Sequence, residues 1–137
     1  MKFKSVIYVV LLSAVWLPLM LNCTKEVDKT LPSITIAAVT GITSTTASCG
    51  GTITSEGGTK VVLQGVHWTT KDSITPDLYE NTTNDTIISG SFVSLITGLE
   101  PATTYRVWAF AYNEAGVIFS EEKTFTTTVK WPTGYLF

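Results

Sequence analysis

Residues 104–113 alternate strictly between two kinds of side chain, and this alternation restricts the fold more than any other feature. One set is Tyr105, Val107, Ala109 and Ala111; the residues between them are Arg106, Trp108, Phe110 and Tyr112. A period of two places each set on its own face of a β-strand, whereas a helix would mix the two sets. The segment is therefore predicted to be a long strand, with the Tyr105 set inward and the Arg106 set outward.

Short runs rich in β-branched residues, separated by turn residues, fill the chain from Ser33 to Thr128. Threonine supplies 24 of the 115 residues after residue 22, and no long run has helical spacing. Gly50 and Gly51 are expected to form a bulge, and Asn113–Gly116 a hairpin turn. The pattern predicts an all-β sandwich of seven strands: Ile34–Val39, Thr45–Thr54, Val61–Thr70, Leu78–Asn81, Gly90–Thr97, Thr104–Asn113 and Val117–Thr127.

The stretch from Leu99 to Gly116 resembles the L-x-P-x-T-x-Y-x-V-x-V-x-A-x-N-x-x-G signature of fibronectin type III domains. The matching residues are Leu99, Pro101, Thr103, Tyr105, Val107, Ala111, Asn113 and Gly116, while Ala109 replaces a larger apolar residue. The resemblance implies a seven-stranded fibronectin type III or immunoglobulin-like β-sandwich over residues 33–128. In such a sandwich Leu99 closes one end of the core and Pro101 stiffens the corner. The hydroxyl of Tyr105 then bonds to the backbone upstream.

The segments Thr45–Gly58 and Gly65–Thr70 are similar to a fibronectin-III-like repeat of surface lipoproteins in some Gram-negative bacteria. In that repeat the positions of Cys49 and His67 are often both cysteine, and His67 rules out a bridge between them here. Cys49 is expected to be a small buried apolar residue, and the single histidine a structural one. A Cys–His nucleophile is the alternative. No metal site, cofactor site or carboxylate pair is predicted.

The N-terminus has the features of a secretory signal peptide over residues 1–22. Lys2 and Lys4 precede an apolar run, Val6–Leu21, which is shorter than a membrane-spanning helix and contains Pro18. The run ends at Met20-Leu21-Asn22-Cys23, which resembles the lipobox of bacterial lipoproteins. The resemblance implies cleavage before Cys23 and lipidation of its sulfur, which anchors the chain to a membrane. Ordinary secretion and retention of the apolar run as an anchor remain the alternatives.

Residues 23–32 are predicted to be the lipidated cysteine and a tether, because they lack periodicity and end in Leu31-Pro32. The nine residues 24–32 span at most about 30 Å. Without Lys2 and Lys4 the chain has seven basic and eleven acidic side chains, a net charge of −4. This balance argues against nucleic-acid binding, which usually needs a basic surface.

The outward set of residues 104–113 is the candidate partner or ligand surface: Arg106, Trp108, Phe110 and Tyr112. Contiguous exposed aromatic side chains on a sheet often mark a contact surface, and planar rings also stack on sugars. A neighbouring strand adds either Val66 and Trp68 or His67, depending on its register. The alternative is that this stripe is covered, either by long side chains such as Arg106 or by the aromatic tail, residues 129–137.

Two further predictions concern modification and the C-terminal tail. Asp72-Ser73-Ile74 and Asp85-Thr86-Ile87 resemble a bacterial O-glycosylation acceptor, which makes Ser73 and Thr86 candidate sites. The tail contains Pro132 and Gly134, which do not continue a strand. It is predicted to be an exposed stub rather than a segment docked on the stripe.

The leading hypothesis is therefore a lipoprotein of the cell envelope, anchored to the outer membrane, with a non-catalytic interaction or spacer domain. The partner is an unidentified protein or glycan. The alternatives are a small carbohydrate-binding module that uses the aromatic stripe, and the first module of a longer surface protein. An enzyme is not predicted, since no triad or phosphate-binding loop occurs.

Overall fold

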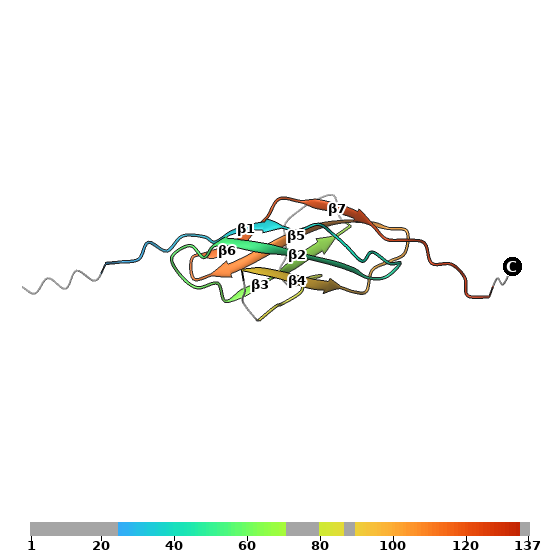
Figure 1. Cartoon of the computed structure of the whole chain (residues 1–137), viewed down its shortest axis with the longest axis horizontal. Helices are drawn as coiled ribbons and strands as arrows, with labels where there is room; N and C mark the ends of the chain where they lie inside the picture. The colour runs from blue at the N-terminus through green and yellow to red at the C-terminus, as the bar shows by residue number, and fades with distance from the viewer. Residues whose placement is uncertain (1–24, 71–79, 87–89, 135–137) are drawn as a thin grey trace, which may run out of the picture.

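Two antiparallel sheets form the domain in the computed structural model, which describes residues 25–70, 80–86 and 90–134 (Figure 1). The first sheet has the order β1 (Ser33–Ile36), β2 (Ala47–Ser55), β4 (Ser91–Ile96). In the second, β3 (Leu63–Thr69) pairs with one edge of β5 (Thr104–Asn113). The other edge of β5 pairs with both β6 (Gly116–Phe119) and β7 (Lys123–Thr126). The predicted all-β, seven-stranded class is confirmed.

Of the seven predicted strands, one is absent from the described residues and one is split, while four others differ from the observed strands by one to three residues at their ends. In its described part, Leu78–Asn81 is not a strand; instead residues 81–85 run along the free edge of β3, where the Thr83 N–H donates to the Val66 carbonyl (2.9 Å). The predicted Val117–Thr127 strand is split into β6 and β7. At the split, the hydroxyl of Ser120 accepts a hydrogen bond from the Ala109 N–H (2.9 Å). A side chain thus replaces the backbone partner that a continuous strand would provide.

Gly50 and Gly51 do not form the predicted bulge, because both pair in continuous register with β4. The irregularity in this sheet lies between Ser33 and Ile34. A Cβ on Gly50 would lie 1.9 Å from the Phe92 carbonyl oxygen, and one on Gly51 would lie 2.6 Å from that of Thr35. The two glycines therefore allow close backbone approach rather than an extra residue in the strand.

The core lies between the sheets and includes the inward set of β5. Tyr105, Val107 and Ala109 belong to it, with Ile36, Ala47, Cys49, Val66, Phe92, Ile96, Leu99 and Phe125. The Tyr105 ring stacks on Phe125 with centroids 5.6 Å apart. Its hydroxyl accepts a hydrogen bond from the Glu100 backbone N–H (2.9 Å), which is the upstream contact expected of this tyrosine.

The opposite end of β5 is held by the buried side chain of Asn113. Its Nδ2 donates to the carbonyl oxygens of Thr30 and Glu56, each at 2.8 Å, and its Oδ1 accepts from the Ala115 N–H (2.8 Å) inside the hairpin turn. Lys29 adds an exposed ion pair to Glu114 (2.7 Å). The last residues of the predicted tether are therefore attached to the domain.

Replacing Tyr105 by Phe keeps the stacked ring and removes the hydroxyl. We expect a loss of about 1 kcal/mol in the free energy of unfolding, because the Glu100 N–H loses its partner in a partly buried site. Chemical denaturation measures it. Tyr112→Phe, which removes a hydroxyl from an exposed ring, is the matched control and should change stability by less than about 0.5 kcal/mol. Equal effects of the two variants would contradict the role of the corner.

Candidate functional site

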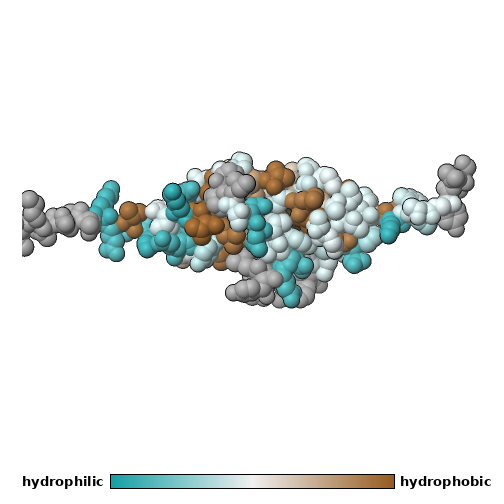
Figure 2. Space-filling model, turned by 90° about the horizontal axis from the view of Figure 1, so that it is seen from below, coloured by the Kyte–Doolittle hydropathy of each residue, from teal (hydrophilic) through white to brown (hydrophobic). Residues whose placement is uncertain are grey.

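The outward set of β5 is mostly buried, so the prediction of an exposed aromatic stripe is wrong for two of its members. Trp108 is 6% exposed and Phe110 is 0% exposed. Only Tyr112, at 41%, is an exposed aromatic of the set, while Arg106 is half-buried. In Figure 2, the apolar residues of the visible face form separate patches among polar ones. Because Trp108 and Phe110 are buried, Arg106, Trp108, Phe110 and Tyr112 do not form a continuous stacking platform.

Neighbouring strands supply the contacts that cover Trp108. His67, and not Val66 or Trp68, lies opposite it in the register of β3, and its ring stacks on the indole with centroids 5.8 Å apart. The Phe119 ring meets His67 edge-on at 6.4 Å and also contacts Phe110 at 6.0 Å. These rings form a second apolar layer on the outer side of the sheet. Alternation identified the face correctly, but it could not show that the face is packed.

Arg106 covers the remaining side of Trp108. Cover by a long side chain is the alternative to an exposed stripe that the sequence left open. Its guanidinium carbon lies 5.8 Å from the centroid of the Trp108 ring. Glu122 fixes the guanidinium through two contacts. The Nε of Arg106 donates to Oε1 of Glu122 at 2.9 Å, and its Nη2 lies 2.8 Å from Oε2. A bidentate pair of this kind holds the planar group in one orientation. The guanidinium of Arg106 is thus already paired within the protein.

Cys49 and His67 lie on different faces and do not form a nucleophile pair. The thiol belongs to the core between the sheets, whereas the imidazole packs in the outer layer with Trp108 and Phe119. Burial raises the pKa of the Cys49 thiol, which keeps it protonated at neutral pH and unreactive. Within the described parts of the chain, no three His, Cys, Asp or Glu side chains come together as a metal-binding group.

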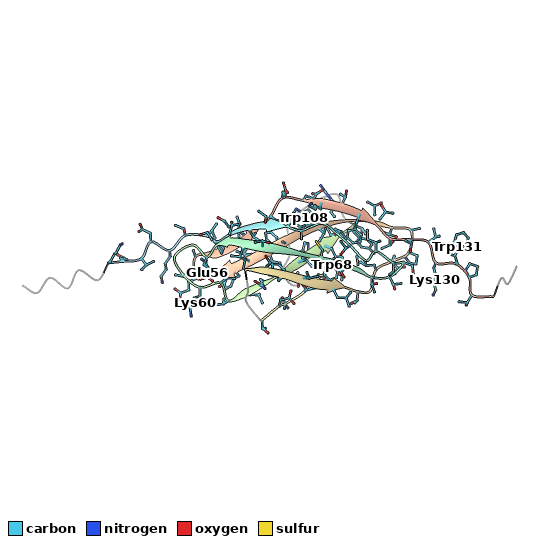
Figure 3. All side chains as sticks on the ribbon, in the orientation of Figure 1. Glu56, Lys60, Trp68, Trp108, Lys130 and Trp131 are labelled. Carbon is cyan, nitrogen blue, oxygen red and sulfur yellow. The ribbon has the colours of Figure 1, made fainter. Side chains whose placement is uncertain are left out.

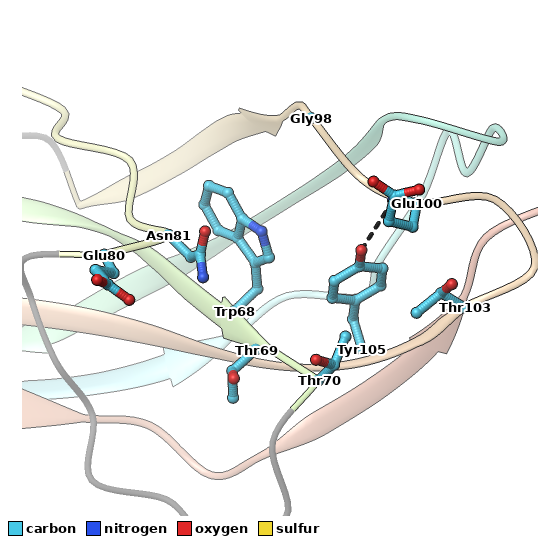
Figure 4. A pocket seen from close by; sticks show the side chains of 9 residues that line it. All are labelled: Trp68, Thr69, Thr70, Glu80, Asn81, Gly98, Glu100, Thr103 and Tyr105. Atoms are coloured by element: carbon cyan, nitrogen blue, oxygen red, sulfur yellow. Dashed lines mark hydrogen bonds between the residues drawn. The ribbon is translucent and has the colours of Figure 1, made fainter.

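The remaining candidate site is an open cavity of about 410 Å³ where β3 ends and β5 begins (Figure 4). Three separate segments supply its walls: the end of β3, Glu80 and Asn81, and the loop that leads into β5. The lining residues are Trp68, Thr69, Thr70, Glu80, Asn81, Gly98, Glu100, Thr103 and Tyr105. Aromatic, carboxylate, carboxamide and hydroxyl groups thus meet in one hollow.

The backbone positions the two sides of this cavity. The Trp68 N–H donates to the carbonyl of Asn81 (3.0 Å), and the indole packs against the core while it also lines the cavity. Asn81 has φ 53°, a left-handed conformation that asparagine tolerates better than most residues. On the other side, the corner contact fixes Tyr105 below Glu100 (Figure 4). The cavity is therefore built by the same hydrogen bonds that hold the fold.

Among the described lining residues the charged side chains are Glu80 and Glu100, and both are acidic. Both are exposed, and neither makes an ion pair with any residue in the described part of the chain. Sequence reasoning missed this site because its walls come from distant segments. It considered Trp68 only as a neighbour of the stripe.

The other predicted sites have separate outcomes. Cys23 and Ser73 lie outside the described residues, whereas Thr86 is exposed. The described part of the tail does not cover the stripe, since Trp131 is 77% exposed and lies beyond the end of the domain with Lys130 (Figure 3). Among residues 25–70, 80–86 and 90–134 there is no helix that is long and apolar enough to cross a membrane.

Solved structures with the same architecture identify the fold. The sixth fibronectin type III domain of human fibronectin type III domain containing protein 3 matches with 21% identity and a TM-score of 0.54, covering 78% of this chain and 95% of that one. The domain has the fibronectin type III fold. A second such domain from human fibronectin type III domain containing protein 3 matches with 18% identity and a TM-score of 0.51, covering 74% and 91%.

A bacterial fibronectin-type neighbour is also found. The sensor domain of the anti-sigma factor RsgI4 of Pseudobacteroides cellulosolvens matches with 21% identity and a TM-score of 0.52, covering 74% of this chain and 98% of that domain. No protein-family model and no curated protein matches the sequence. Because these identities are low, the likeness establishes the fibronectin type III fold and nothing about the ligand.

If Trp108 is a packing residue, replacing it should destabilise the fold. We expect Trp108→Ala to lower the free energy of unfolding by about 3–5 kcal/mol, because it leaves a cavity beneath Arg106 and beside His67. The matched control is Trp131→Ala, which removes an exposed indole and should cost less than about 0.5 kcal/mol. Denaturant titration of both variants checks this. If Trp108→Ala were as stable as Trp131→Ala, the result would contradict the packing role of Trp108 and support an exposed stripe.

Proposed function

We propose that this protein is an envelope lipoprotein, anchored to the outer membrane through Cys23, whose fibronectin type III domain is a non-catalytic spacer and interaction module. The sequence at Met20–Cys23 supports the anchor, because a cysteine directly follows the apolar run of a signal peptide. Two acyl chains on such a cysteine give stable attachment, whereas one chain gives only marginal binding.

The observation that carries the spacer role is the placement of the two ends of the domain. The chain enters beside Glu56 and leaves toward Trp131 at the other end of the long axis (Figures 1 and 3). A domain anchored at one end therefore presents its other end away from the membrane. Both the tail and the cavity at Trp68 belong to that far half, since the cavity lies where β5 starts and Asn113 lies where it ends.

A non-catalytic role is supported by the state of the reactive side chains. The Cys49 thiol is buried and has a raised pKa, and the imidazole of His67 is packed between aromatic rings on the other face. The carboxylates that line the cavity, those of Glu80 and Glu100, are both solvent-exposed.

The anchor is tested by replacing Cys23 with Ser in the full chain. We expect the variant to move from the membrane fraction to the soluble fraction, because Ser has no sulfur to carry the lipid. Mass spectrometry of the wild-type N-terminus should show an acylated Cys23 as the first residue.

The matched control is Cys49→Ala, which removes the other cysteine and should leave the chain in the membrane fraction. An unmodified peptide that reads through Asn22 into Cys23 would overturn the proposed anchor. Release of both variants would also contradict it, since only Cys23 is assigned to the membrane.

A further inference from the structure

The cavity beside Trp68 has a chemical character that restricts its ligand. The charged groups among its described lining residues, Glu80 and Glu100, are both acidic and disfavour phosphate and other anionic ligands. The volume of about 410 Å³ lies within the range of roughly 300–1,000 Å³ that is typical of small-molecule sites. These two carboxylates favour a neutral or cationic ligand.

An aromatic side wall is the second feature. Trp68 is half-buried, with its inner side against the core and the rest of the indole toward the cavity. Figure 4 shows the indole nitrogen on the side that faces Tyr105. Among the described residues nothing accepts a hydrogen bond from this N–H. A ligand with a flat apolar face and polar edges fits against such a ring.

The third feature is the mixture of donors and acceptors around the ring. The indole N–H of Trp68 and the amide of Asn81 can donate, while the carboxylates of Glu80 and Glu100 accept. The hydroxyl of Thr103 donates to the Pro101 carbonyl (2.9 Å) and is left as an acceptor. A lysine or arginine side chain would use only the acceptors and would leave the donors of Trp68 and Asn81 without partners. Sugar hydroxyls both donate and accept, so a saccharide would use all of these groups.

We propose that this cavity binds a neutral saccharide, with a sugar ring against Trp68 and its hydroxyls bonded to Asn81, Glu80 and Glu100. The inference deepens the interaction role proposed above, but it does not depend on the lipid anchor. The proposed glycan site is therefore this cavity and not the outer face of β5, where Trp108 and Phe110 are buried.

The test is a titration of the ¹⁵N-labelled full chain in a detergent without a sugar headgroup, followed through the tryptophan indole N–H signals. The probes are neutral trisaccharides of glucose, mannose, galactose and N-acetylglucosamine, and trilysine as the cationic probe. We expect at least one trisaccharide to shift the Trp68 signal saturably at millimolar concentration, while the Trp108 and Trp131 signals stay unchanged. The Trp68→Phe variant assigns the signal.

Asn81→Asp distinguishes the two classes of ligand. It keeps the shape of the side chain, removes the amide donor and adds a negative charge, so saccharide binding should weaken about five- to tenfold. Trilysine binding, if present, should strengthen. Tyr112→Ala, on an exposed residue outside the cavity, is the control and should leave the affinity unchanged.

Three results would overturn the proposal: no shift of Trp68 with any trisaccharide, equal shifts of all the indole signals, or a response to trilysine alone. The same titration on Cys23→Ser keeps the two proposals apart. Saccharide binding by a chain released from the membrane would support the cavity, and membrane attachment without binding would support only the anchor.

Discussion

The structure depends on one strand, β5, which is buried on both faces and fixed at both ends. Its inner residues fill the core, and its outer residues Trp108 and Phe110 lie in a second apolar layer. At its start the Tyr105 hydroxyl holds the preceding loop, and at its end the Asn113 amide holds the N-terminal segment and the turn after β2. The other strands of the second sheet all pair with β5.

The contact at Asn113 also bears on the proposed anchor, because it attaches the segment before β1 to the domain. Thr30 is bonded to Gly57, and a Cβ on Gly58 would lie only 2.6 Å from the carbonyl oxygen of Asp28. In the proposed lipoprotein, the distance from Cys23 to the attached residue Asp28 would be at most about 18 Å, instead of the about 30 Å expected from the sequence. Such a short connection would limit how far the domain turns toward the membrane.

Sequence patterns predicted local structure well where one short segment contains all the information. Both ends of β5 were predicted correctly, and so was the corner contact of Tyr105. Patterns failed where the outcome depends on a distant segment. Alternation separated the faces of β5, but the burial of Trp108 requires His67, Phe119 and Arg106. The cavity could not be predicted for the same reason, since three segments meet at Trp68 only in the folded chain.

The central claim is that the Asn113 end of the domain faces the membrane and the Trp68 end faces away. Paramagnetic relaxation enhancement of the acylated full chain, in nanodiscs that contain a gadolinium-chelating lipid, tests it most directly. The account predicts the strongest broadening for the backbone amides of Gly57, Gly58 and Ala115, and the weakest for Gly98 and Ala102. Equal broadening at the two ends, or a reversed gradient, would contradict it.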